Sequence, residues 1–186
     1  GVAIVPTQWS ADLQLDELRY AARHFSVDEL IVKPAVSANA DDTYRVPVGD
    51  VDSFFALAGD RFGNRECLIQ PFLNPVVAEG EFSLFYFNGV LSHCILKTPA
   101  TGDFRVQEEH GGRLRLIEGP ESALLQAGDK AIQCLPEQLL YARLDFVRTD
   151  NAFLLMEAEL IEPSIYFNMD PKSPERFALA VREFGL

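Results

Sequence analysis

The sequence predicts an α+β fold in two lobes, and three observations carry this prediction. Before about residue 70, two amphipathic helical segments are each followed by a short apolar, strand-like segment. After it, alternating strand patterns dominate, and the pair Asn88-Gly89 between two of them is typical of a type I′ hairpin. Two further alternating runs flank the polar residues 149–151, which indicates a second hairpin. We therefore expect a first lobe over about residues 1–70 and a second, mostly antiparallel lobe over about residues 71–186.

The first lobe begins with an apolar run at residues 2–5, which we interpret as an interior strand that enters a turn at Pro6. Because the chain starts inside this strand, with Gly1 rather than Met, we expect a fragment of a longer protein whose upstream N-terminal domain is absent. Ser10 is the expected N-cap of the first helix. The elements that follow are this helix through Phe25, a strand at 29–33 ended by Pro34, an amphipathic helix at 51–62 and a strand at 67–69.

A proline-rich bend at residues 70–75 separates the lobes, and strands dominate the second one. A last helix is expected to be capped by Ser173, with Pro174 in its first turn, where the N–H that proline lacks has no helical partner. The other expected elements are strands at 82–87, 91–97 and 113–117, a long loop at 98–112, a helix at 123–135 and the second hairpin.

The composition excludes several classes of protein. With 186 residues, 48% of them apolar, the chain is long enough to bury a core. Its net charge of −12 argues against nucleic acid or an anionic membrane surface as a partner, because phosphates would be repelled. No apolar run has the length of a membrane span and no signal peptide is recognisable, so we expect a cytoplasmic protein. Cys67, Cys94 and Cys134 lie far apart among apolar neighbours and are expected to be buried free thiols.

Three acidic residues in the second hairpin, Asp145, Glu157 and Glu159, are the most informative feature of the chain. If the loop has three residues, Asp145 lies opposite Glu157 and Arg143 lies opposite Glu159, all on one face of the sheet. Carboxylates held together on a sheet face repel one another unless a cation binds. Because clustered oxygen ligands suit Mg²⁺, the pattern predicts a metal site.

The neighbours of this cluster, Phe153, Leu155 and Ile161, are apolar and are expected on the same face. Two alternatives remain open from the residues alone. In the first, Arg143 neutralises one acid and the edge of the hairpin leaves the others in water. In the second, the hairpin binds a structural cation and no nucleotide.

Two segments near the bend between the lobes are candidate nucleotide contacts. Lys33 ends a strand and precedes small and hydroxylic residues, an arrangement that can place an ammonium and backbone N–H groups on a phosphate, although such a lysine is often only solvated. The bend itself, around Gln70, Phe72 and Leu73, would offer backbone groups to the edge of an adenine, with a simple hinge as the alternative.

The segment that runs from Lys97 through the long loop is a third candidate, because it holds Lys97, Arg105 and His110 and is expected beside the acidic hairpin. Loops of this kind often grip and cover a phosphoryl group. Arg105 is the strongest candidate of the three. Its alternative role is a surface salt bridge to Asp103 or Glu108, which would contribute little to stability.

Read in order, these segments resemble the ATP-grasp superfamily of carboxylate ligases, in the branch of bacterial glutathione synthetase and of the ligase that closes the ring of D-cycloserine. The resemblance covers nearly the whole chain and implies the ATP-grasp fold. The matching segments are IVKP, LIQPFL, GEFS with the hairpin after it, GDFR followed by GG, ARLDFV, and MEAEL followed by EPS.

The resemblance implies a role for each matching residue. Asp145, Glu157 and Glu159 would hold two Mg²⁺ ions, with Mn²⁺ as the alternative ion, and Arg105 would stabilise the transferred phosphoryl group and the acyl phosphate. The implied contacts to ATP are Lys33 at the α- and β-phosphates, Ser37 in the phosphate-covering loop, Gln70, Phe72 and Leu73 at the adenine, Glu79 or Glu81 near the ribose, and Lys97.

Two departures from the family pattern qualify these roles. The phosphate-covering loop SANADDTY has no glycine, so we expect it to be stiffer and to use the hydroxyls of Ser37 and Thr43. The last metal position, commonly Asn in the family, is Glu159, which adds a negative charge.

The resemblance implies an ATP-dependent carboxylate–amine ligase that acts on small-molecule acid and amine substrates, through an acyl phosphate, and releases ADP and phosphate. The alternative is a catalytically inactive nucleotide-binding module with a regulatory or partner-binding role. The residues Lys33, Arg105, Asp145, Glu157 and Glu159 favour the ligase, because a module that only binds has little need of two metals.

Overall fold

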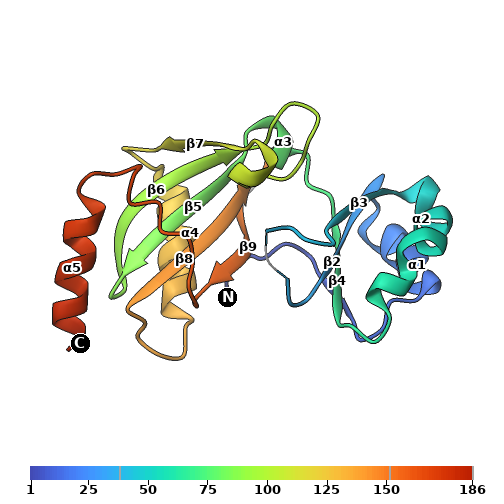
Figure 1. The fold of residues 1–186 in the computed structure, drawn as a ribbon, viewed down its shortest axis with the longest axis horizontal. Helices are drawn as coiled ribbons and strands as arrows, with labels where there is room; N and C mark the ends of the chain where they lie inside the picture. The colour runs from blue at the N-terminus through green and yellow to red at the C-terminus, as the bar shows by residue number, and fades with distance from the viewer. Residues whose placement is uncertain (38, 151, 186) are drawn as a thin grey trace. The chain divides into compact units, whose positions relative to one another are not determined.

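The computed structural model describes residues 1–37, 39–150 and 152–185. The chain divides into two compact units (Figure 1), which we call the N-terminal unit, Val5–Leu73, and the C-terminal unit, Asn74–Leu186 together with Gly1–Ile4. The sequence placed the first four residues in the first lobe. In the structure Ile4 forms a parallel bridge with Leu155, and the Leu155 amide donates to the carbonyl of Ala3 at 2.9 Å. This backbone pairing assigns them to the C-terminal unit instead.

The N-terminal unit contains a four-stranded antiparallel sheet in the order β1-β4-β2-β3. The sequence missed the short strand β3, which follows a polar stretch and ends in a proline. The elements of this unit are β1 (Gln8–Ser10), α1 (Leu15–Phe25), β2 (Glu29–Pro34), β3 (Tyr44–Pro47), α2 (Val51–Ala58) and β4 (Cys67–Pro71), with short 3₁₀ helices at Val48–Asp50 and Gly59–Phe62 around α2.

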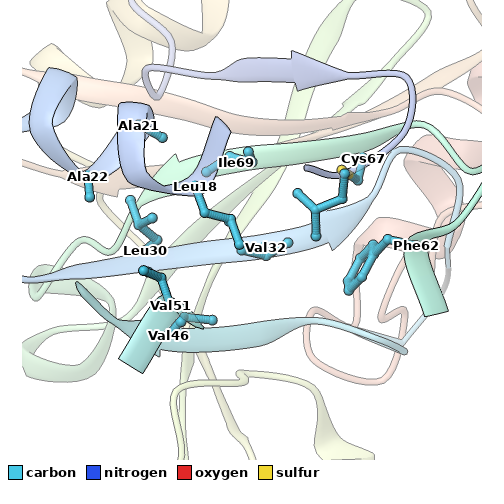
Figure 2. Close-up of a cluster of buried hydrophobic side chains, with 11 residues drawn as sticks. Leu18, Ala21, Ala22, Leu30, Val32, Val46, Val51, Phe62, Cys67 and Ile69 are labelled. Atoms are coloured by element: carbon cyan, nitrogen blue, oxygen red, sulfur yellow. The ribbon is translucent and has the colours of Figure 1, made fainter. Parts of the chain in front are cut away.

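Helix α1 packs on one face of this sheet and closes its core. Figure 2 shows Leu18 of α1 pointing toward Leu30 and Val32 of β2, and all three side chains are fully buried. Burial of one such side chain contributes roughly 1.5–3 kcal/mol. Because side chains alternate along a strand, Ile31 and Lys33 lie on the other face of the sheet.

The first helix begins later than the sequence predicted. Ser10 belongs to β1, and its hydroxyl donates to Glu17 Oε2 at 2.6 Å rather than capping a helix. The N-cap is Gln14, which forms a capping box with Glu17. Residues 2–5 form the single bridge at Ile4 rather than the expected strand, and β1 begins only at Gln8.

The C-terminal unit is built on a five-stranded antiparallel sheet in the order β7-β6-β5-β8-β9. The hairpin at Asn88-Gly89 is confirmed, since both residues have the positive φ angles, 51° and 77°, that a type I′ turn requires. The elements are α3 (Pro75–Ala78), β5 (Glu81–Phe87), β6 (Val90–Thr98), a 3₁₀ helix (Glu108–His110), β7 (Arg113–Leu116), α4 (Ser122–Gln133), β8 (Tyr141–Arg148), β9 (Phe153–Glu159) and α5 (Ser173–Phe184).

The two faces of the five-stranded sheet differ in character. On one face Leu84, Leu144 and Phe146 pack with Leu124 of α4 in an apolar core. At one end of the opposite face, Phe177 of α5 lies against Phe87 with ring centroids 5.1 Å apart. The rest of that face carries the charged residues of the acidic hairpin.

Two smaller expectations need correction. Ser173 is the first residue of α5, and Lys172 is its N-cap, because Ser173 Oγ donates back to the carbonyl of Asp170 at 2.7 Å. Cys67 and Cys94 are buried free thiols as expected, but Cys134, the C-cap of α4, is exposed.

Among the described residues, none of the helices has the length and apolar character needed to cross a membrane.

Candidate metal and nucleotide site

In the part of the hairpin that carries the acids, the two strands pair as the sequence predicted. Asp145 is opposite Glu157, and Arg143 is opposite Glu159. The predicted three-residue loop is wrong, however, because β8 ends at Arg148 and β9 begins only at Phe153. Asn151 of the predicted loop lies outside the described residues.

A β-bulge restores the predicted register. The pairing shifts between Asp145 and Phe146, which leaves Met156 as the extra residue of β9. The longer loop shifts the pairing by one residue and the bulge shifts it back by one residue. The acids therefore have the partners that the sequence predicted. The bulge also reverses the alternation of β9, so Phe153 and Leu155 pack in the apolar core on the other face, contrary to the prediction. Ile161 is exposed and does not enclose the cluster either.

Asp145, Glu157 and Glu159 meet on the face of the sheet opposite α4. Each offers one carboxylate oxygen, and these three oxygens lie within 4.8 Å of one another. Asp145 is fully buried, Glu159 is half-buried and Glu157 is exposed. The cluster is therefore anchored inside the sheet and open to solvent at its outer edge.

Two buried cations hold the inner part of this cluster. Lys97 is the direct cross-strand partner of Glu81, and its Nζ contacts Glu81 and lies 3.0 Å from Asp145 Oδ2. Arg143 donates from Nη2 to the same Asp145 oxygen at 3.0 Å and also pairs with Glu159. Ser83 completes the set by donating to Asp145 Oδ1 at 2.6 Å.

The charges of this network explain its pKa shifts. Burial alone would raise the pKa of Asp145, but Lys97 and Arg143 outweigh burial and lower that pKa to about 2. Burial raises the pKa of Glu81 to about 7, against the opposing effect of Lys97. Burial also raises the pKa of Glu159.

The donor set fits a divalent cation. Four carboxylates, at positions 81, 145, 157 and 159, face the two cations Lys97 and Arg143, so the fully ionised network has a net charge of −2. Hard carboxylate oxygens at this spacing are the ligands that Mg²⁺ prefers. The first alternative from the sequence is also partly correct, because Arg143 does pair with two of the acids.

Gly80 fixes the strand that carries Glu81. Its φ of +119° favours glycine, and a Cβ at this position would lie 2.4 Å from the carbonyl oxygen of Lys97. Only a glycine lets β5 approach β6 this closely, which keeps Glu81 and Lys97 in register.

The other predicted residues of the C-terminal unit have partners outside the carboxylate cluster. Arg105 donates from Nη2 to Asp103 Oδ2 at 2.8 Å, which is the alternative considered for it. The hydrogen bond from Arg105 lowers the pKa of Asp103. Glu79 accepts a hydrogen bond from Arg148 Nε at 2.7 Å. His110 ends the 3₁₀ helix of the long loop.

The predicted residues of the N-terminal unit lie on and around β2 and β4. Lys33 lies opposite Leu68, on the face away from the core. The Gln70 side chain donates to Thr7 Oγ1 at 2.8 Å, and the Phe72 amide donates to the Glu29 carbonyl at 2.9 Å. The hinge residues Gln70 and Phe72 are thus buried and bonded, and Leu73 is the last residue of the unit.

The glycine-free loop after Lys33 uses its own residues to turn. Ser37 Oγ donates to the carbonyl of Asp41 at 2.8 Å, and Asp42 accepts hydrogen bonds from Arg61 and Arg65. Asn39, Ala40 and Asp42 all have φ near +55°, a conformation that glycine adopts more readily. Ala38, in the middle of the predicted loop, lies outside the described residues.

Sequence reasoning missed Ser83 and gave Arg143 too small a role. Ser83 lies on the neighbouring strand β5, directly opposite Asp145, so no local pattern in the sequence connects the two. Arg143 is two residues from Asp145, and the period of a strand was the signal that placed both on one face.

Comparisons with known proteins agree with this architecture. No protein-family model matches the chain. The cycloserine biosynthesis protein DcsG from Streptomyces lavendulae is 27% identical over 198 residues, which cover 98% of this chain and 65% of that protein. The solved structure of D-cycloserine synthetase DcsG matches with a TM-score of 0.82 and 25% identity, over 98% of this chain and 65% of its own. The chain thus spans 65% of the length of this relative.

Two further solved structures share the fold at lower identity. A D-alanine–D-alanine ligase from Bacillus anthracis in complex with ATP matches with a TM-score of 0.66 at 18% identity, over 98% of this chain and 59% of that one. The ATP-grasp ligase PsnB, in complex with a precursor variant, Mg and ADP, matches with a TM-score of 0.63 at 14% identity, over 98% and 54%. With its two α+β units and antiparallel sheets, the chain has the ATP-grasp fold, and it is similar to ATP-grasp ligases over nearly its whole length.

Proposed function

We propose that this chain is the ATP-grasp part of an ATP-dependent carboxylate–amine ligase. In this reaction a substrate carboxylate oxygen attacks the γ-phosphorus of ATP and ADP leaves. An amine then attacks the acyl phosphate, loses a proton and displaces phosphate. The observation that carries the proposal is the group of three carboxylate oxygens within 4.8 Å, held beside Lys97 and Arg143 on one face of a sheet.

The chain's own residues would bind and orient rather than form covalent bonds. Asp145, Glu157 and Glu159 would hold two Mg²⁺ ions, or Mn²⁺ in their place, which when bound offset the negative charge of the ATP phosphates. Arg143 and Lys97 keep the buried Asp145 ionised and therefore ready to act as a ligand. Arg105 would hold the transferred phosphoryl group, after exchanging its bond to Asp103 for one to phosphate.

The partners of the proposed reaction are ATP and small-molecule carboxylate and amine substrates. The relatives support ATP as the nucleotide, because one of them is a ligase solved with ATP and another is a ligase solved with Mg and ADP. The residues assigned to ATP are Lys33, Ser37, Gln70, Phe72, Leu73, Glu79, Glu81 and Lys97.

Calorimetric titration of Mg-ADP and Mg-ATP tests this function on the chain itself. We expect binding that requires the divalent cation and weakens at least tenfold in Glu157→Ala, because Glu157 is an outer ligand whose loss leaves the core intact. Glu175→Ala is the matched control, since Glu175 is an exposed acid on α5 outside the cluster. Equal affinity with and without the cation, or unchanged binding by Glu157→Ala, would contradict the proposal.

A further inference from the structure

His93 is a buried polar residue on the same sheet face as the carboxylate cluster. It lies directly opposite Phe85 on β5, and Phe85 in turn lies opposite Arg143 on β8. Its side chain is 5% exposed, and its ring stacks flat on Phe85 with centroids 4.2 Å apart and an interplanar angle of 2°. No pattern in the sequence singles out this histidine.

Both ring nitrogens of His93 have partners. Nε2 lies 3.0 Å from the carbonyl oxygen of Ile165, and Nδ1 lies 2.9 Å from Ser92 Oγ. A carbonyl can only accept, so Nε2 carries the proton and donates. Burial lowers the pKa of His93 and keeps the ring neutral, so Nδ1 accepts from the Ser92 hydroxyl.

The hydrogen bond from His93 to Ile165 fixes the segment that follows Glu159, the last acid of the cluster. After Glu159 the chain leaves β9 and returns across the sheet face at residues 164–166. Arg143 Nη1 donates to the carbonyl of Ser164 at 3.4 Å, one residue before the His93 bond. The same guanidinium holds Glu159 and Asp145. One short segment is therefore bonded both to the cluster and to His93.

Tyr166, the next residue, shows that this conformation needs support. Its φ is +54°, which is uncommon for a residue other than glycine. Its ring lies edge-on to Phe85 at a centroid distance of 6.2 Å, so Phe85 contacts both His93 and Tyr166. An unfavourable backbone conformation persists only where its surroundings fix it.

We propose that His93 is a positioning residue for the carboxylate cluster. Its bond to Ile165, together with its stacking on Phe85, fixes the segment after Glu159 and thereby holds Arg143 and Glu159 in the arrangement that receives a divalent cation. The part of this inference that concerns the cation rests on the proposed function.

Three variants distinguish a role of His93 in positioning the carboxylate cluster from a role in packing alone. His93→Phe keeps a flat ring beside Phe85 and removes the donor, whereas His93→Gln keeps a donor and loses the stacking. Tyr86→Phe is the matched control, because Tyr86 is equally buried on β5, faces the apolar core and loses only its 3.4 Å bond to Asp129.

The experiment measures Mn²⁺ affinity and hydrogen exchange of the peptide that contains residues 164–169, where the Met169 amide donates to the Tyr166 carbonyl. In His93→Phe we expect faster exchange in this peptide and Mn²⁺ affinity at least about threefold weaker, as the loss of one buried hydrogen bond implies. His93→Gln should recover part of both, and Tyr86→Phe should change neither.

Each outcome decides the inference. Wild-type Mn²⁺ affinity in His93→Phe would overturn it and leave the proposed function intact. Absence of Mn²⁺ binding by the wild-type chain would overturn the metal site of the proposed function, and the role of His93 toward the cation with it. Unchanged exchange at residues 164–169 in His93→Phe would overturn the anchoring itself.

Discussion

On the α4 side of the C-terminal sheet, Leu84, Leu144 and Phe146 are fully buried among apolar side chains. On the other side, the residues beside them on the same strands, Ser83 and Asp145, are buried just as deeply, but among charges and hydrogen bonds. The apolar face is stabilised by the removal of surface from water, whatever the detailed pairing. The charged face depends on each partner being present, because a buried charge without its partner is strongly unfavourable.

Stability and ligand binding are thus divided between the two faces of one sheet. A fully packed apolar face tolerates no ligand, whereas the charged face keeps an excess of negative charge that a cation can offset. Substitutions on the first face should change folding alone. Substitutions on the second should change folding and metal binding together, and the metal should restore what the substitution removes.

The largest effect is expected on the apolar face. Phe146→Ala removes a fully buried ring and should lower the free energy of unfolding by roughly 3–5 kcal/mol. The Mn²⁺ affinity of the fraction that remains folded should be unchanged. Urea denaturation measures the first quantity, and calorimetry at low temperature measures the second. A loss of Mn²⁺ affinity in folded Phe146→Ala would contradict the separation of the two faces.

On the charged face, Arg143→Met leaves the carboxylates of Asp145 and Glu159 without their shared cation. We expect a loss of about 3 kcal/mol in the free energy of unfolding, measured without divalent cations. Saturating Mn²⁺ should recover part of this loss, because it neutralises the same carboxylates. An equal loss with and without Mn²⁺ would show that the cation does not bind there.

The stability of the charged face should depend on pH through Glu81. Because burial raises the pKa of Glu81 from 4.5 to about 7, the folded state keeps a proton that the unfolded state has already released between these values. Stability without divalent cations should therefore fall as pH rises through this window, by roughly 1–3 kcal/mol. Glu81→Gln cannot titrate and should reduce this dependence to the smaller part that comes from Glu159, whose pKa burial also raises. A wild-type curve parallel to that of Glu81→Gln would contradict the shifted pKa.

The smallest effect on stability is expected at Arg105, whose pair with Asp103 is partly exposed. Arg105→Met should change the free energy of unfolding by less than about 0.5 kcal/mol. It should nonetheless weaken Mg-ATP relative to Mg-ADP, if Arg105 holds the phosphoryl group that is transferred. Arg113→Met, at an exposed arginine of β7, is the control and should change neither. Equal effects on both nucleotides would remove Arg105 from the proposed mechanism.

Local patterns predicted much of this fold, because they depend on neighbours in the chain. The Asn88-Gly89 turn identified the first hairpin. The alternation of β8 and β9 identified the second hairpin and put Asp145 and Glu157 opposite each other. The bulge at Met156 was not predictable, since nothing in LLMEAEL marks the extra residue. The pairing of the acids was nevertheless predicted correctly, because two errors cancel: the loop was predicted one residue too short, and the bulge was missed.

Contacts between distant strands were beyond the reach of the sequence. Lys97 was correctly expected at the end of a strand, but the acids that neutralise it, Glu81 and Asp145, come from two other strands and were not connected with it. The same applies to Ile4, whose bridge to Leu155 joins residues from the two ends of the chain. Such pairings depend on sheet order, which periodicity within a segment does not encode.

The most direct test of the central claim is a crystal structure of the chain with Mn²⁺ and ADP, with data collected for the anomalous signal of manganese. We expect anomalous peaks coordinated by the carboxylate oxygens of Asp145, Glu157 and Glu159, with Ser83 still bonded to Asp145. Manganese bound elsewhere, with no anomalous peak beside these three carboxylates, would contradict it.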